Sequence, residues 1–138
     1  MSTSSLESLH RGIQRCHKCR LSETRTHAVP GEGPTTAGIM FIGEAPGEKE
    51  DMEGRPFRGR SGRFLDELLA SIGMTRSEVY ITSSVKCRPP GNRDPQRDEL
   101  CICRHAWLEQ QIDAIDPVLM VLLGKTDAYQ VLEYKGSL

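Results

Sequence analysis

Apolar residues follow two spacings that alternate along the chain. Short continuous apolar runs are typical of strands buried on both faces of a parallel sheet. Elsewhere apolar residues recur every three or four positions, which indicates helices with one buried face. The pattern predicts strands at residues 39–42, 79–82 and 118–123, and helices at residues 6–16, 64–72, 98–115 and 126–132.

The alternation of strands and helices predicts the fold class. It is the order of an α/β sandwich whose parallel strands are joined by right-handed crossovers. The 138 residues suffice for one domain and are too few for two of ordinary size, so residues 1–138 are predicted to form a single domain. The Gly- and Pro-rich segment of residues 44–62 reads as a loop that directly follows a strand. Ligands of open α/β sheets bind at such strand ends, and we expect a functional site there.

Charge and hydropathy narrow the class of protein. A formal net charge of -1 with 27% charged residues excludes a disordered acidic tail and a histone-like basic protein. Binding to nucleic acid would therefore need local positive charge, and arginines do gather in two segments, residues 55–63 and 76–97. No apolar run reaches the roughly 18 residues that cross a bilayer, and the N-terminus lacks the apolar core of a signal peptide. The sequence thus predicts a cytoplasmic protein with no membrane partner.

Five cysteines point to a metal centre. Cys16 and Cys19 form a CxxC pair, and Cys87 and Cys103 bracket a proline-rich loop, with Cys101 as a fifth candidate. The cytoplasm keeps thiols reduced and the count is odd, so metal ligands are favoured over disulfides. Four thiolates suit either zinc or a [4Fe-4S] cluster, and their spacing leaves both open, although a zinc ribbon would normally repeat the CxxC. In either case the centre is expected to be structural.

Four segments together carry a family resemblance. They are CHKCRLSETRT, GEAPGEKED, GRPFRGRSG and VYITSSVKCRPPGNRDP, within a resemblance that runs from about Cys16 to Gly124. In order and spacing, they resemble the family 4, iron-sulfur uracil-DNA glycosylases, which excise uracil from DNA in base excision repair and leave an abasic site. The resemblance implies a three-layer α/β/α sandwich around a parallel four-stranded sheet. It also implies a [4Fe-4S] cluster held by Cys16, Cys19, Cys87 and Cys103, with Cys101 as an extra thiol.

Removing uracil requires a flipped-out base, a pocket that reads its polar edge, and stabilisation of the negative charge that develops on the leaving base. Phe57 matches the family's stacking phenylalanine. Backbone N–H groups of the turn from Gly43 to Gly47 are expected to bind the uracil carbonyls and a water. Glu44 is a candidate general base, and a solvated or helix-capping glutamate is the alternative. Ala45 stands where other families place a water-activating aspartate. Stabilisation of the negative charge on the leaving uracil must therefore supply more of the reduction in activation free energy.

DNA contacts and base specificity are further expectations. We expect Arg58, Arg60, Arg88 and Arg93 to contact phosphates that flank the lesion. Ser83 stands where family members carry an asparagine whose amide pairs with uracil. Losing such a two-point contact costs about 1–3 kcal/mol of base discrimination, which puts uracil specificity in question.

The family continues beyond a third strand to a fourth strand and a His-Pro loop, whose histidine stabilises the leaving uracil. No residue after Leu138 supplies them, so the sandwich is expected to be incomplete at its C-terminus. Three functions stay open: a glycosylase, a non-catalytic iron-sulfur module that binds DNA or its lesions, and a redox protein. Salt-sensitive binding to DNA would favour the first two, and reversible cluster reduction without DNA binding would favour the third.

Overall fold

A parallel sheet forms the middle layer of the structure, a computed structural model that describes residues 3–124. Its strands β1 (Ile39–Gly43), β2 (Tyr80–Ser83) and β3 (Leu119–Leu122) lie in the order β2-β1-β3. The register pairs Gly43 with Ser83, so the carboxyl ends of β1 and β2 lie side by side. The three strands fall at the three apolar runs, and their prediction is confirmed.

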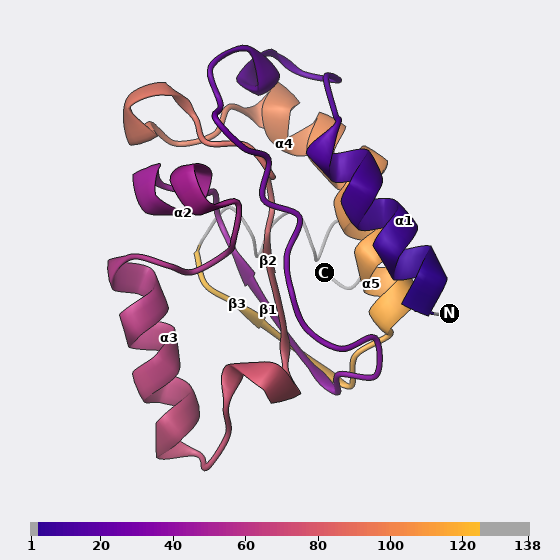
Figure 1. Cartoon of the computed structure of the whole chain (residues 1–138), viewed down its shortest axis with the longest axis vertical. Coiled ribbons are helices and arrows are strands. Elements are labelled where there is room, and N and C mark those ends of the chain that lie inside the picture. The colour runs from indigo at the N-terminus through magenta and orange to yellow at the C-terminus, as the bar shows by residue number, and fades with distance from the viewer. Residues whose placement is uncertain (1–2, 125–138) are drawn as a thin grey trace.

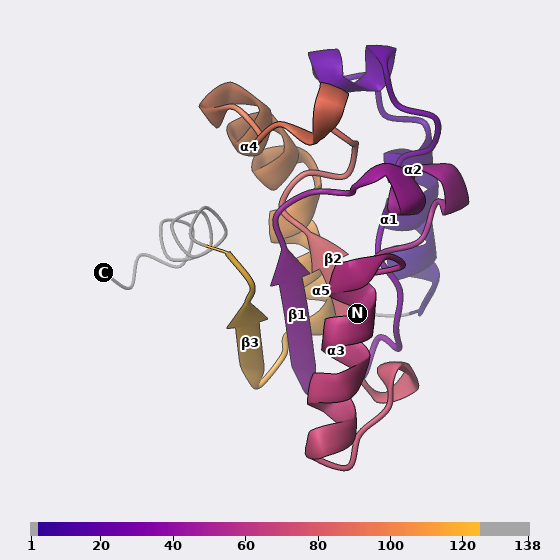
Figure 2. The same ribbon diagram turned by 90° about the vertical axis from the view of Figure 1, so that its left-hand side faces the viewer.

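Helices cover both faces of the sheet, as the α/β/α prediction requires. Helix α3 (Arg60–Ser71) covers one face, and α1 (Thr3–Gln14) and α5 (Glu109–Ile115) cover the other (Figures 1 and 2). Alternate residues of β1 face the two layers, because side chains alternate along a strand. Phe41 packs in the core on the α3 side, whereas Met40 and Ile42 pack in the core with α1 and α5.

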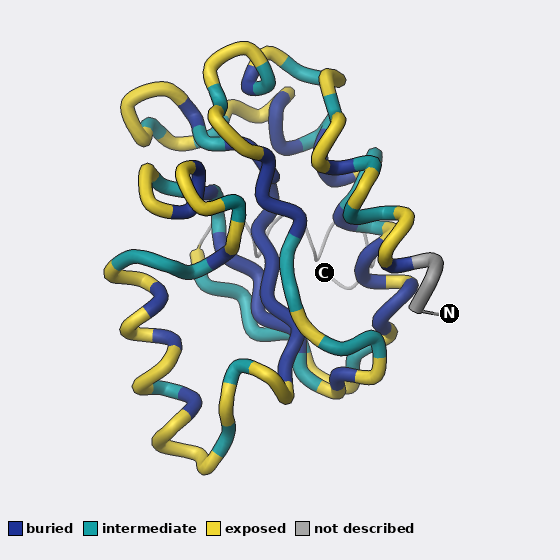
Figure 3. Tube along the Cα trace, in the orientation of Figure 1, coloured by how far each residue is buried: buried dark blue, intermediate teal, exposed yellow. Residues whose placement is uncertain are grey.

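Burial follows these layers (Figure 3). Strands β1 and β2 are almost wholly buried, whereas the outer helices alternate between buried and exposed residues. Strand β3 is only partly buried, and Leu119 keeps 54% of its surface exposed. Within residues 3–124, β3 has a partner on one side only, which accounts for this exposure.

Some local predictions need correction. The predicted loop at residues 44–62 contains a helix, α2 (Glu48–Glu53), which begins after Gly47 because the Glu50 carboxylate accepts the Gly47 N–H. The helix predicted at residues 98–115 is a continuous run of α4 (Arg97–Cys103), a π-helical turn (Arg104–Leu108) and α5. The first helix ends before Cys16, so this cysteine lies in the following loop. The helix predicted at residues 126–132 lies outside the described residues.

Candidate functional site

A cavity of about 290 Å³ opens beside the adjacent carboxyl ends of β1 and β2. Its size is close to the lower end of small-ligand pockets, which begin at about 300 Å³. It lies at a strand end, where the loop of residues 44–62 led us to expect a site. The lining brings together the turn after β1, the loop before α3 and the end of β2: Val29, Gly43, Glu44, Ala45, Pro46, Glu50, Pro56, Phe57, Ser61, Phe64, Ser83 and Leu123.

The backbone of Phe57 is fixed in an uncommon conformation. Its φ of 53° lies in the left-handed region, which non-glycine residues adopt rarely and often at functional sites. Arg76 donates hydrogen bonds of 2.7 Å to the carbonyl oxygens of Phe57 and Pro56. The ring packs on the backbone of Gly43, where an added Cβ would come 2.7 Å from the ring atom Cζ. Glycine at position 43 therefore makes room for the ring at the cavity wall.

The turn after β1 is held from the side of β2. Ser84 N donates to the carbonyl oxygen of Gly43 at 2.8 Å, and Val85 N donates to that of Glu44 at 3.3 Å. The Ala45 N–H has no acceptor among residues 3–124, and Ala45 lines the cavity. This N–H is therefore available to donate to a carbonyl oxygen of a bound ligand, because a backbone N–H is a strong donor.

Ser83 reaches the cavity with the donor of its hydroxyl already used. The residue is 6% exposed, and its hydroxyl donates to the carbonyl oxygen of Val85 at 2.6 Å. Its oxygen lone pairs remain as an acceptor for a ligand, whereas an asparagine amide would present both a donor and an acceptor. The structure thus gives a geometric reason for the altered base recognition expected from this residue.

A second cavity of about 260 Å³ adjoins the first and shares Glu44, Ala45 and Pro46 with it. Gly47 lines this second cavity, together with the loop of residues 89–95. That loop brings Asn92, which the sequence analysis missed, to the same rim as Glu44. Asn92 has a φ of 59°, a conformation that asparagine tolerates better than most residues. The Pro-Gly-Asn sequence was a signal of the turn and gave no sign of its position in space.

Three of the four arginines predicted to contact DNA already bind side chains of the protein. Arg58 Nε donates to Glu53 Oε1 at 2.9 Å, and Arg88 Nε donates to Asn92 Oδ1 at 2.6 Å. Arg93 binds both carboxylate oxygens of Glu99, at 2.9 and 2.8 Å. Within the described part of the chain, the exposed Arg60 has no such partner.

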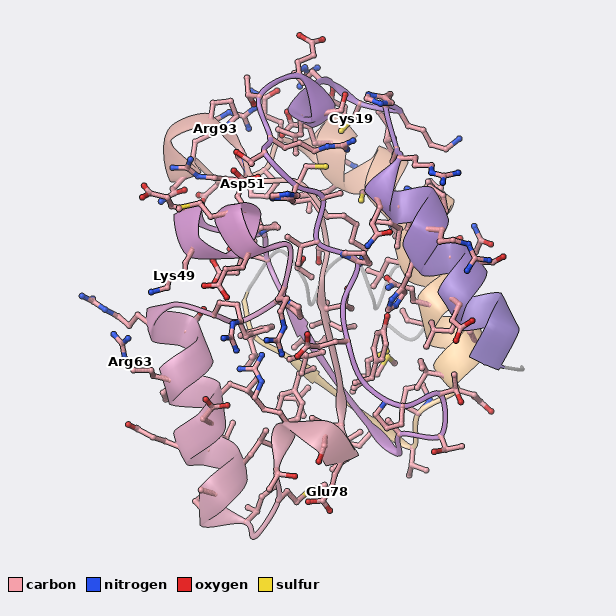
Figure 4. The ribbon with its side chains drawn as sticks, in the orientation of Figure 1. Cys19, Lys49, Asp51, Arg63, Glu78 and Arg93 are labelled. Carbon is pink, nitrogen blue, oxygen red and sulfur yellow. The ribbon has the colours of Figure 1, made fainter. Side chains whose placement is uncertain are left out.

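The side chains of Lys49 and Arg63 are also exposed, and neither makes a hydrogen bond or ion pair within residues 3–124. They point outward from α2 and α3 on the same side of the molecule (Figure 4). Together with Arg60 they form the free-cation group, which lies beside the Glu50 and Ser61 walls of the two cavities.

Glu99 links the two loops that carry cysteines. Its side chain is 1% exposed, accepts the backbone N–H of Gln96 at 2.8 Å, and binds Arg93 and Arg20. The hydrogen bonds from Arg93 are the main reason that the pKa of this carboxyl falls from its ordinary value of 4.5 to about 2. Glu99 therefore ties the segment after the CxxC pair to the segment after Cys87.

Four of the five cysteines surround one space. Cys16, Cys19, Cys87 and Cys103 line it, together with apolar side chains that include Leu21, Val85, Ile102 and Trp107. Cys101 is absent from this lining, and all five cysteines are free thiols. Among residues 3–124, no three metal-binding side chains are arranged so as to hold one metal ion. The structure thus brings together the four cysteines that the family resemblance implies as ligands, and their role as ligands stays a prediction.

Hydrogen-bond donors and burial both act on the sulfurs. Cys16 Sγ accepts from the indole Nε1 of Trp107 at 3.3 Å and from the backbone N–H of Lys18 at 3.4 Å, and Arg25 donates to Cys87 Sγ at 3.2 Å. Burial raises the pKa of Cys19 and Cys87, and raises that of Cys103 to about 12. These thiols would keep their protons unless a metal replaced them, because a coordinating thiol is deprotonated by the metal. The donor set therefore fits a thiolate-held metal centre.

Sequence comparisons agree with this geometry. The profile of the uracil DNA glycosylase superfamily matches residues 30–137. The chain is 48% identical to the type-4 uracil-DNA glycosylase of Sulfurisphaera tokodaii over 96% of this chain and 60% of that protein. It is 51% identical to the type-4 enzyme of Saccharolobus solfataricus over 82% of this chain and 52% of that protein. Identity to the type-4 enzyme of Thermotoga maritima is 46%, over 88% of this chain and 62% of that protein.

The chain therefore belongs to the uracil DNA glycosylase superfamily. Within that superfamily its similarity is to the type-4 enzymes, as the four segments had indicated. The chain spans between 52% and 62% of the length of these three relatives. No helix within residues 3–124 is long and apolar enough to cross a membrane.

Proposed function

We propose that the protein is a uracil-DNA glycosylase that hydrolyses the N-glycosidic bond of uracil in DNA and leaves an abasic site. The observation that carries the proposal is the cavity at the ends of β1 and β2, which gathers the turn after β1, Phe57 and Ser83 around one space. The similarity to type-4 enzymes supports the same reaction. Residues 1–138 would act as one domain, in the cytoplasm, where thiols stay reduced.

In this proposal the base enters the cavity after rotating out of the DNA helix. The Phe57 ring stacks on it, and the Ala45 N–H donates to one of its carbonyl oxygens. When the bond between base and sugar breaks, the electron pair stays with the uracil, and the Ala45 N–H stabilises the resulting negative charge. Glu44 would accept the proton of the water that adds to the sugar. Gly43 and Gly47 allow the backbone of the turn to approach the base and this water.

We infer that Cys16, Cys19, Cys87 and Cys103 hold a [4Fe-4S] cluster. When bound, such a cluster would join the loop after α1 to the segments on both sides of the proline-rich loop, which is a structural role. The four-cysteine space and the N–H donors aimed at Cys16 and Cys87 support this inference. The test is the iron and inorganic sulfide content of anaerobically purified protein. Cys103→Ala should lose both, whereas the matched Cys101→Ala should keep them.

Arg60 is the strongest candidate for contact with the DNA phosphates, because it belongs to the free-cation group. The other predicted contacts are Arg58, Arg88 and Arg93. Arg60 need not break an existing hydrogen bond to reach a phosphate, whereas the other three must exchange a partner. Each lost phosphate contact lowers the slope of log affinity against log salt by about 0.9 on duplex DNA. Arg60→Ala should therefore reduce that slope by about 0.9.

A second candidate function is a non-catalytic module that binds DNA or its lesions, and one observation favours it. The Ser83 hydroxyl is committed to Val85, so the end of β2 offers less for base recognition than an asparagine would. The two functions separate on an oligonucleotide with a single uracil, treated with alkali after incubation. Strand breakage at the uracil means a glycosylase. Tight, salt-sensitive binding without breakage means the module.

A further inference from the structure

Helix α2 carries two neighbouring buried acids, Glu50 and Asp51, which are 8% and 4% exposed. Both bind backbone N–H groups, but they bind different loops. Glu50 reaches the two loops that line the cavity, whereas Asp51 reaches residues 26 and 27, which are absent from the lining of both cavities. The proposed reaction assigns no role to either acid, and Glu50 is a wall of both cavities.

The Glu50 carboxylate uses both of its oxygens. Oε1 accepts the Gly47 N–H at 2.9 Å, and Oε2 accepts the N–H groups of Arg58 at 2.8 Å and Gly59 at 2.9 Å. The first bond is half of a capping box at the start of α2. Capping does not account for the two bonds of Oε2, which cross to the loop that follows Phe57. One side chain thus joins the turn after β1 to the loop that carries the stacking ring.

We propose that Glu50 is a positioning residue, which sets the spacing between the turn of Gly43 to Gly47 and the Phe57 loop. The inference rests on the proposed function, in which Phe57 and the Ala45 N–H must act on the same base. Arg76 donates to the carbonyl oxygen of Phe57 and Glu50 accepts the N–H of Arg58, the next residue, so the loop is attached to both side chains. A separation wrong by about 1 Å can cost about 100-fold in rate, because both groups must meet the base at once.

The arrangement requires a carboxylate rather than an amide. All three partners of Glu50 are donors, and a glutamine would turn its own NH₂ group toward one of them. Burial alone would raise the pKa of Glu50, but the hydrogen bonds from Gly59 and Arg58 lower it below the ordinary value of 4.5, so the group stays ionised near neutral pH. Replacing Glu50 by glutamine therefore removes at least one of the two loop attachments.

Asp51 offers a matched control. Only its Oδ1 accepts, from Thr26 N at 2.8 Å and His27 N at 3.2 Å, and asparagine retains that oxygen. Asp51→Asn therefore makes the same chemical change, on the next residue of the same helix, without disturbing the attachment. Asp51 is absent from the lining of both cavities.

The experiment compares the protein with its Glu50→Gln and Asp51→Asn variants, each loaded with iron and sulfide to the same level. Hydrogen exchange at the amides of Gly47, Arg58 and Gly59 reports the attachment without reference to catalysis. Single-turnover excision of uracil and affinity for the same oligonucleotide report the consequence. We expect faster exchange in Glu50→Gln, an excision rate about 100-fold lower, and a dissociation constant changed by less than about threefold. Asp51→Asn should match the wild type in all three.

The outcomes separate the two proposals. Faster exchange in Glu50→Gln together with wild-type protein that excises no uracil would reject the proposed function and leave the attachment by Glu50 standing. Unchanged exchange at all three amides would overturn the inference. A Glu50→Gln variant that excises uracil as fast as Asp51→Asn would also overturn it. A loss of excision rate in Glu50→Gln that is matched by an equal loss of DNA affinity would do the same.

Discussion

Gly62 lies in the first turn of α3, beneath the carbonyl group of Phe57. A Cβ at this position would come 2.0 Å from the Phe57 oxygen and 2.5 Å from its carbonyl carbon. Cβ atoms essentially never approach another atom closer than 3.0 Å, so Gly62→Ala must displace the Phe57 backbone by about 1 Å. The contact is with backbone, which cannot rotate away as a flexible side chain would.

Two effects of opposite sign decide the stability of this variant. Alanine inside a helix is favoured over glycine by about 1 kcal/mol, so helix propensity alone predicts a gain. Overpacking a close contact costs about 1–3 kcal/mol, and here it involves a backbone that is already in the left-handed region. We therefore expect a small net loss of stability. The effect on rate should be larger, about 100-fold, because the stacking ring moves by about 1 Å.

The assay is single-turnover excision from a uracil-containing oligonucleotide, with urea unfolding as the measure of stability. Gly38→Ala is the control, because nothing lies within 4 Å of a Cβ at that position and Gly38 lies outside the cavity lining. Gly38→Ala should match the wild type in rate. A Gly62→Ala variant with the same rate as Gly38→Ala would refute the claim that the Phe57 loop must be held at its present position.

Three further predictions concern individual side chains. Ser83→Asn should raise the ratio of the excision rates of uracil and cytosine by a factor that corresponds to about 1–3 kcal/mol. An unchanged ratio would contradict the role given to Ser83. Glu99 has its pKa lowered to about 2, so its contribution to stability is present above the ordinary value of 4.5 and is lost as the pH falls toward 2. The free energy of unfolding of Glu99→Gln, measured by urea titration, should therefore change less between about pH 5 and pH 3 than that of the wild type. The same pH dependence in both proteins would count against this role of Glu99. Lys49→Ala combined with Arg60→Ala should lower the salt slope of binding to duplex DNA by about 1.8, whereas an unchanged slope would exclude both residues from phosphate contact.

The sequence predicted the parts of the fold that depend on local pattern. The strand at residues 39–42 was visible as an apolar run, because a central strand of a parallel sheet is buried on both faces. The loop after that strand predicted a site at its end, which is where the cavity lies. The choice of a [4Fe-4S] cluster, and of Cys103 over Cys101 as a ligand, depended on the family resemblance, because spacing alone left zinc and iron-sulfur open.

Features that depend on tertiary contacts escaped prediction. Helix α2 has only six residues and is rich in charge, and its start depends on the Glu50 side chain, whose partners include Gly59 in the next loop. The pairing of Arg93 with Glu99 could not be seen from composition, which showed only an arginine-rich segment. Asn92 reached the rim of the site through the path of its loop, which no local periodicity encodes.

The most direct test of the central claim is excision by the protein itself. Anaerobically purified protein would be incubated with a labelled oligonucleotide that carries one uracil, and alkali would then cut the strand at any abasic site. The proposed function predicts breakage at the uracil and none at a thymine in the same position. Intact iron-sulfur content and tight DNA binding without breakage would contradict it.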